Sequence, residues 1–225
     1  MKQWQQLQAE DGHEFDLYVS TPAGGADAAG KGVIVVVQEI FGVNSHIRSV
    51  CDRLAEAGYL AVAPALFDRY GKGYEAGYSP TEVEQSRAFL QDFDFDAACR
   101  DIGAAVGAFA ERGPVSVVGF CLGGSLAWLM AARDDRLAAS VGYYGGRIPD
   151  FVAETPQCPT LLHFGEQDQG IPLAGVESVR RRHPEVPVHL YQAGHGFNCD
   201  QRGSYHAQSA QLAWQRTLDF IAAQS

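Results

Sequence analysis

The sequence PVSVVGFCLGG (residues 114–124) decides the fold class, because an apolar run ends there in a turn built from small residues. A strand that runs into such a turn must bend sharply, and Gly119, Gly123 and Gly124 permit close backbone contact. This pattern predicts Cys121 at the end of a strand and directly before a helix that starts at about Leu122. The amides and positive dipole of a helix N-terminus favour a thiolate. Cys121 is therefore the candidate nucleophile, and the alternative is a buried structural thiol.

Strands and helices alternate along most of the chain. Two polar-alternating strands at 3–8 and 14–20 predict a hairpin, with Asp11 and Gly12 in its turn. Further strands are expected at 33–37, 59–65, 115–119, 139–145, 159–165 and 186–192, and helices at 45–57, 94–111 and 204–222 and from Pro80. Alternation of this kind predicts an α/β fold with a mostly parallel eight-stranded sheet flanked by helices. We expect residues 1–225 to form a single domain.

Composition excludes several classes of function. The net charge is −10 and Lys and Arg are not clustered, which argues against a nucleic-acid partner. The longest apolar run is far shorter than the roughly 20 residues that span a bilayer, and no apolar leader opens the chain. The five cysteines lack CxxC pairs, so no disulfide scaffold or Cys-rich zinc site is indicated. We expect a cytoplasmic monomer without cofactor, metal or membrane contact.

Polar residues that directly follow the strands are the candidate catalytic groups, since ligands bind at the carboxyl ends of parallel strands. His195, in AGHGF, follows the last expected strand, where its loop can bring an imidazole to Cys121. Glu166 and Asp168 follow the strand before it. Asp168 is better placed to orient the imidazole, and Glu166 remains the alternative. The order nucleophile, acid, histidine is the order of α/β-hydrolases.

An oxyanion hole needs two preorganised amide donors. The elbow supplies one from Leu122, the residue after the nucleophile. The loop that starts QEIFG after the strand at 33–37 is expected to supply the other, from Ile40.

Several motifs carry a resemblance to a known family. DGHEF (11–15), VVVQEIFGVN (35–44), GFCLGG (119–124) and AGHGF (193–197) together resemble the dienelactone hydrolase family, the carboxymethylenebutenolidases. The resemblance implies an α/β-hydrolase with a triad of Cys121, Asp168 and His195. It also implies a hydrolase that opens a dienelactone-like lactone to a maleylacetate-type acid, or a related activated ester, through an acyl-enzyme.

The resemblance implies two further roles. Glu39 is expected to interact with the resting thiol until an anionic lactone displaces it, and Arg48 is expected to pair with Glu39. The family's two carboxylate-binding arginines are absent, because Val83 and Cys199 stand at the aligned positions. Arg87 and Arg202 lie nearby in the sequence.

Whether Arg87 and Arg202 replace the missing pair or are surface charges stays open at this point. Two alternative functions also stay open. One is a general small-molecule carboxylesterase or thioesterase. The other is a thiol redox or binding module that uses Cys121 with Cys199 and has lost hydrolysis.

Overall fold

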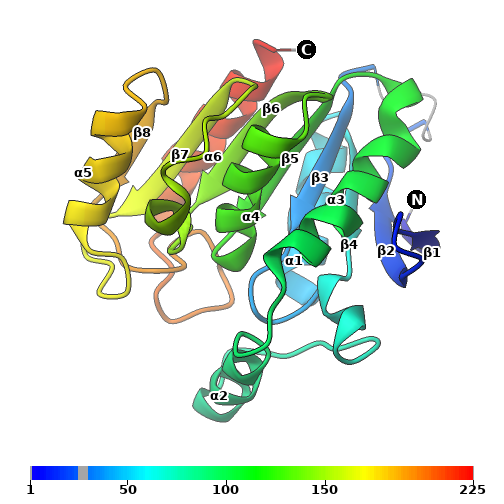
Figure 1. Cartoon of the computed structure of the whole chain (residues 1–225), viewed down its shortest axis with the longest axis horizontal. Coiled ribbons are helices and arrows are strands. Elements are labelled where there is room, and N and C mark those ends of the chain that lie inside the picture. Colours follow the sequence, from blue (N-terminus) through cyan, green and yellow to red (C-terminus); the bar gives the residue numbers. More distant parts are fainter. Residues whose placement is uncertain (1, 25–29, 225) are drawn as a thin grey trace. The chain divides into compact units, whose positions relative to one another are not determined.

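A computed structural model describes residues 2–24 and 30–224 (Figure 1). Its eight strands form a sheet in the order β1-β2-β4-β3-β5-β6-β7-β8. The strands are β1 (Lys2–Gln8), β2 (Glu14–Ser20), β3 (Val33–Val37), β4 (Leu60–Pro64), β5 (Val115–Phe120), β6 (Leu137–Tyr143), β7 (Thr160–Gly165) and β8 (Val188–Tyr191). The predicted fold class, a mostly parallel eight-stranded sheet with helices, is confirmed.

The helices lie between these strands. They are α1 (Ser45–Glu56), α2 (Pro80–Ala88), α3 (Phe95–Phe109), α4 (Leu122–Arg133), α5 (Leu173–Arg182) and α6 (Ala207–Ala222), with 3-10 helices at Leu66–Arg69, Ala110–Arg112 and Ile148–Phe151. Across the described residues, 2–24 and 30–224, none of these helices is long and apolar enough to cross a bilayer. By their internal contacts, residues fall into two compact units, 1–116 and 117–225.

The first unit is built on an antiparallel hairpin and a parallel pair. β1 pairs with β2, β2 pairs antiparallel with β4, and β4 pairs parallel with β3. Gly12 turns the predicted hairpin with φ +86°, a conformation that glycine adopts without strain. All five residues of β3 are buried, as expected for a strand covered on both faces. Helices α1 and α3 both contact β3 and β4.

Local sequence signals set the helix ends in this unit. The Asn44 side chain accepts a hydrogen bond from the amide of Ile47 and begins α1, and Gly58, with φ +98°, follows its end. Pro80 is the first residue of α2, behind a capping box formed by Ser79 and Glu82.

The second unit carries the parallel strands β6, β7 and β8. Helix α4 contacts β6, and α6 contacts β6 and β7 from the opposite face (Figure 1). The sequence predicted the last helix from about residue 204, but α6 begins at Ala207. The reason is the imidazole of His206, which accepts a hydrogen bond from the amide of Ser209 and so caps the helix three residues later.

Candidate active site

The turn between β5 and α4 holds Cys121 in an unusual backbone conformation, with φ +56° and ψ −111°. Its amide donates to the carbonyl oxygen of Tyr143, 3.0 Å away. A Cβ at Gly119 would overlap the Gly123 carbonyl, and one at Gly124 would overlap the Tyr143 carbonyl. The small residues of GFCLGG are therefore required by close backbone packing, as the sequence predicted.

The structure brings Cys121, His195 and Asp168 together within the second unit. The Nε2 atom of His195 lies 3.2 Å from the sulfur of Cys121, and its Nδ1 atom lies 2.7 Å from Oδ2 of Asp168. The other carboxylate oxygen of Asp168 accepts a hydrogen bond from the amide of Gly170 at 2.9 Å. The Asp168 side chain is fully buried, whereas 29% of the His195 side chain is exposed. This arrangement can take a proton from the thiol and return it to a leaving group.

Electrostatics favour a charged imidazole in this group. Burial lowers the pKa of His195, but the sulfur of Cys121 and the hydrogen-bonded carboxylate of Asp168 outweigh burial and raise this pKa to about 10. The imidazolium is therefore the favoured form of His195 at neutral pH.

Glu166, the alternative acid, is oriented differently. Its amide donates to the carbonyl oxygen of Tyr191, and its carboxylate accepts a hydrogen bond from the side chain of Gln192. Asp168, two residues later, is the carboxylate that contacts His195. The turn after β7 thus directs the carboxylate of Asp168 toward His195 and that of Glu166 toward Gln192.

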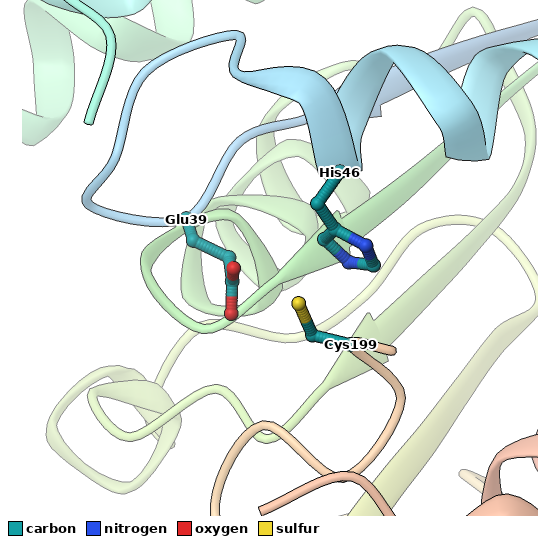
Figure 2. A group of neighbouring side chains, drawn as sticks. All are labelled: Glu39, His46 and Cys199. Carbon is teal, nitrogen blue, oxygen red and sulfur yellow. The ribbon is translucent and has the colours of Figure 1, made fainter. Parts of the chain in front are cut away.

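The first unit holds Glu39 at the end of β3. Its side chain is buried, and its Oε2 atom accepts a hydrogen bond from the hydroxyl of Tyr78 at 3.0 Å. Figure 2 shows Glu39 in the loop after β3 and His46 in the first turn of α1. The carboxylate of Glu39 and the imidazole of His46 have ligand atoms within 4.8 Å of each other.

The expected pairing of Arg48 with Glu39 is wrong. The Nη1 atom of Arg48 lies 2.6 Å from the carbonyl oxygen of Val43 and 2.6 Å from Oε1 of Glu75. The guanidinium lies at the surface, where it is part-exposed, while Glu39 is buried. The charged guanidinium of Arg48 therefore pairs with Glu75 at the surface, and the hydroxyl of Tyr78 donates to Glu39.

The two oxyanion candidates belong to different units. Leu122 is the first residue of α4, where backbone amides lack partners within the helix. Ile40 is buried in the loop after β3. Their joint role stays a prediction.

The two arginines that could bind a carboxylate have different surroundings. The guanidinium of Arg202 packs over the backbone of Gly196, so closely that a Cβ there would come 2.5 Å from Nη1. Gly196 directly follows His195. Arg87 lies exposed in the last turn of α2. Neither Cys199, which is buried, nor Cys121 is part of a disulfide.

Two tyrosines near these candidates were missed by the sequence reasoning. Tyr144 has φ +39°, and its ring centroid lies 5.0 Å from that of His195. The sequence placed Tyr144 inside the strand expected at 139–145, whereas β6 ends at Tyr143, so Tyr144 directly follows the strand. Tyr78 contacts Glu39 from a loop 39 residues away, and no local pattern marks that contact.

Comparison with known proteins shows the family of the chain. Residues 15–225 match the model of the dienelactone hydrolase family. The chain belongs to the dienelactone hydrolase family. Like other members of this family, it is a hydrolase of esters or lactones.

Several family members resemble the chain over nearly its whole length. The carboxymethylenebutenolidase of Pseudomonas putida is 37% identical over 230 residues, 96% of this chain and 94% of that protein. The carboxymethylenebutenolidase of Pseudomonas knackmussii matches to the same extent. A crystal structure from Klebsiella pneumoniae, assigned as a dienelactone hydrolase, superposes with a TM-score of 0.84 and 32% identity, covering 99% of both chains.

Proposed function

We propose that this protein opens a lactone with an enolate leaving group, as in dienelactone, through an acyl-enzyme on Cys121. The observation that carries the proposal is the 3.2 Å contact between the Cys121 sulfur and Nε2 of His195, whose Nδ1 is held by Asp168 at 2.7 Å. A nucleophile, a base and an orienting acid are thus in hydrogen-bond contact in the order required for acyl transfer.

Acylation begins with the thiolate and imidazolium pair. The sulfur of Cys121 attacks the lactone carbonyl carbon. The resulting oxyanion accepts a hydrogen bond from the amide of Leu122 and, by the family resemblance, one from the amide of Ile40. Collapse of the intermediate breaks the ring carbon–oxygen bond. The enolate oxygen leaves and takes the proton from Nε2 of His195, which leaves a thioester and a neutral imidazole.

Deacylation uses the same residues in reverse. The neutral imidazole of His195 takes a proton from water while the water oxygen attacks the thioester carbonyl. The carbon–sulfur bond then breaks, which releases the acid and restores the thiolate of Cys121 beside an imidazolium. Asp168 keeps Nδ1 protonated throughout, so Nε2 performs both transfers.

The same site explains why a cysteine suits this substrate. A thiolate is a strong nucleophile near neutral pH, and an enolate is a good leaving group. Glu39 is proposed to interact with the resting thiol until substrate binds, although the sulfur contacts His195 in this structure. Ordinary esters and amides, with poorer leaving groups, should react more slowly.

Arg202 is the better candidate for holding a substrate carboxylate. Its guanidinium packs against Gly196, the residue after His195, whereas Arg87 is exposed on α2. A guanidinium beside the catalytic imidazole can grip a carboxylate with two hydrogen bonds. Arg202→Gln should therefore weaken the preference for an anionic lactone, and Arg87→Gln is the matched control.

The decisive experiment measures ring opening of dienelactone by the purified protein, with p-nitrophenyl acetate as an uncharged ester and Cys121→Ala as the blank. Fast, Cys121-dependent turnover of the lactone supports the proposal. Equal turnover of the uncharged ester favours a general carboxylesterase or thioesterase. Absence of turnover, together with a Cys121–Cys199 disulfide after mild oxidation, favours a redox module.

A further inference from the structure

A chain of buried polar side chains runs through the second unit, and the proposed chemistry does not use it. The imidazole of His163 on β7 is fully buried. Its Nδ1 lies 2.8 Å from the hydroxyl of Tyr191 on β8, and its Nε2 lies 3.1 Å from the hydroxyl of Thr217 on α6. Arg216 donates to the Tyr191 hydroxyl at 3.1 Å, and the hydroxyl of Tyr143 on β6 lies 2.6 Å from that of Thr217.

The direction of these hydrogen bonds defines the tautomer of His163. A guanidinium has only donors, so the Tyr191 oxygen accepts from Arg216. Its own proton is then directed to Nδ1 of His163, which must be the acceptor. Nε2 therefore carries the hydrogen and donates to Thr217. The opposite tautomer would leave the buried Tyr191 proton without the Nδ1 acceptor, which is costly.

The same geometry keeps His163 neutral. A protonated Nδ1 would point a second donor at the Tyr191 oxygen and place a buried positive charge near Arg216. The ionisable groups that face His163 are Tyr143 from β6, His189 and Tyr191 from β8, and Arg216 from α6. Burial first, then His189 and Arg216, hold the pKa of His163 well below its ordinary value.

The network lies at the base of the two loops that carry the catalytic acid and base. Tyr191 is the last residue of β8, four residues before His195, and His163 lies five residues before Asp168. Their side-chain bond therefore joins β7, two residues before its end, to the last residue of β8. The Tyr191 ring also packs against Phe197, two residues after His195, with centroids 5.1 Å apart.

Backbone hydrogen bonds continue this connection into the loops. The amide of Glu166 donates to Tyr191, and the amide of Gln167 donates to Ala193. The carbonyl of His163 accepts the amide of Tyr144, the residue whose ring lies beside His195. A shift of β8 relative to β7 would thus change the separation of the acid and the imidazole.

We propose that neutral His163 is a positioning residue, whose bond to Tyr191 holds the ends of β7 and β8 at the spacing that keeps His195 in contact with Asp168 and Cys121. This inference rests on the proposed function. A shift of about 1 Å at such a site is enough to lower catalysis substantially.

The test compares the two bonds of the same imidazole. Tyr191→Phe removes only the hydroxyl on the Nδ1 side, and Thr217→Val removes the hydroxyl on the Nε2 side, away from the catalytic loops. NMR titration of the imidazoles then gives the pKa of His195 in each folded variant. Tyr191→Phe should lower the His195 pKa by about one unit and shift the alkaline limb of kcat/KM equally, a tenfold loss above the new limb. Thr217→Val should lower the Tm and leave the His195 pKa unchanged.

Two variants of His163 complete the design. His163→Gln retains an acceptor and a donor and should keep the His195 pKa close to its wild-type value, whereas His163→Leu should lower it. Nitrogen chemical shifts should show His163 protonated on Nε2 alone from pH 5 to pH 9. The inference is overturned by a His163 that titrates in this range, or by a Tyr191→Phe or His163→Leu variant that loses thermal stability while the His195 pKa stays fixed.

Failure of the proposed function has a different signature. If the wild-type protein hydrolyses neither lactone nor ester, the acyl-enzyme proposal fails. The NMR titrations need no turnover, and they still decide whether His163 positions His195.

Discussion

At the scale of single residues, the backbone of Cys121 is the most informative feature. A non-glycine residue at φ +56° is strained by about 1–3 kcal/mol, and such strain persists only where surrounding structure enforces it. The hydrogen bond from the Cys121 amide to the carbonyl oxygen of Tyr143 and the adjacent helix α4 enforce it here. The result is a sulfur in hydrogen-bond contact with His195, which is a placement that nucleophilic chemistry requires.

The raised pKa of His195 predicts the pH dependence of turnover. Because this pKa lies at about 10, above its ordinary value of 6.5, His195 is protonated at neutral pH and loses its proton as the pH rises through about 10. The alkaline limb of kcat/KM should therefore lie near pH 10. Asp168→Asn removes one of the two stabilising groups and should move that limb to lower pH.

Glu166→Gln is the matched control for this prediction, since Glu166 bonds to Gln192 and Asp168 bonds to His195. It should leave the limb in place. An alkaline limb near pH 6.5 in the wild-type protein would contradict the charged pair.

At the scale of elements, the turn from β5 into α4 depends on backbone atoms that approach each other too closely for side chains. Gly124 lies against the carbonyl of Tyr143 and the amide of Gly145, and the amide of Arg147 donates to the Ser125 hydroxyl. The loop after β6 is thus packed onto the first turn of α4. This packing fixes the position of Cys121 relative to β6.

Substitution of one of these glycines tests the packing. Gly124→Ala places a Cβ against two backbone groups, so either α4 or the loop after β6 must move. We expect a loss of about 1–3 kcal/mol in the free energy of unfolding, measured by denaturant titration, together with reduced turnover. Gly203→Ala is the control, because a Cβ there meets no atom within 4 Å. Equal stability of the two variants would refute the requirement for close packing.

At the scale of the molecule, a buried ion pair joins segments distant in the sequence. Arg69 binds Asp101 on α3 through two hydrogen bonds, at 2.8 and 2.6 Å, and Asp11 in the hairpin turn. The Asp101 side chain is fully buried. Its carboxylate pKa is raised by burial and lowered in part by Arg69. Within residues 1–116, this contact connects the hairpin, a 3-10 helix and α3.

Removal of Arg69 should therefore destabilise the whole chain. Arg69→Met leaves a buried carboxylate without its partner, and we expect a loss of about 3–5 kcal/mol in thermal or chemical unfolding. Arg147→Met breaks the exposed pair with Asp150 and should cost less than about 1 kcal/mol. Similar losses in the two variants would show that burial of Asp101 contributes little.

The prediction of a single domain is tested by cooperativity. If residues 1–225 unfold as one domain, fluorescence and circular dichroism should report one coincident transition. Two separate transitions would show that the compact units 1–116 and 117–225 unfold independently.

The sequence alone determined the fold class, the elbow and the family, because each is written in local patterns. β-branched runs, helical spacing and the small residues around Cys121 are short-range signals. The same signals placed Asp168 and His195 after their strands. The predicted start of α6 was wrong by only three residues, because the local sequence did not distinguish the cap residue His206 from the loop before it.

Only the tertiary structure decided which side chains meet. It chose Asp168 over Glu166, gave Arg48 the partner Glu75, and brought Arg202 against the loop of His195. It also assembled the chain through His163 and Tyr191, residues 28 apart. The physical reason is that such contacts depend on the direction of each side chain after distant strands have paired, and no local spacing encodes that direction.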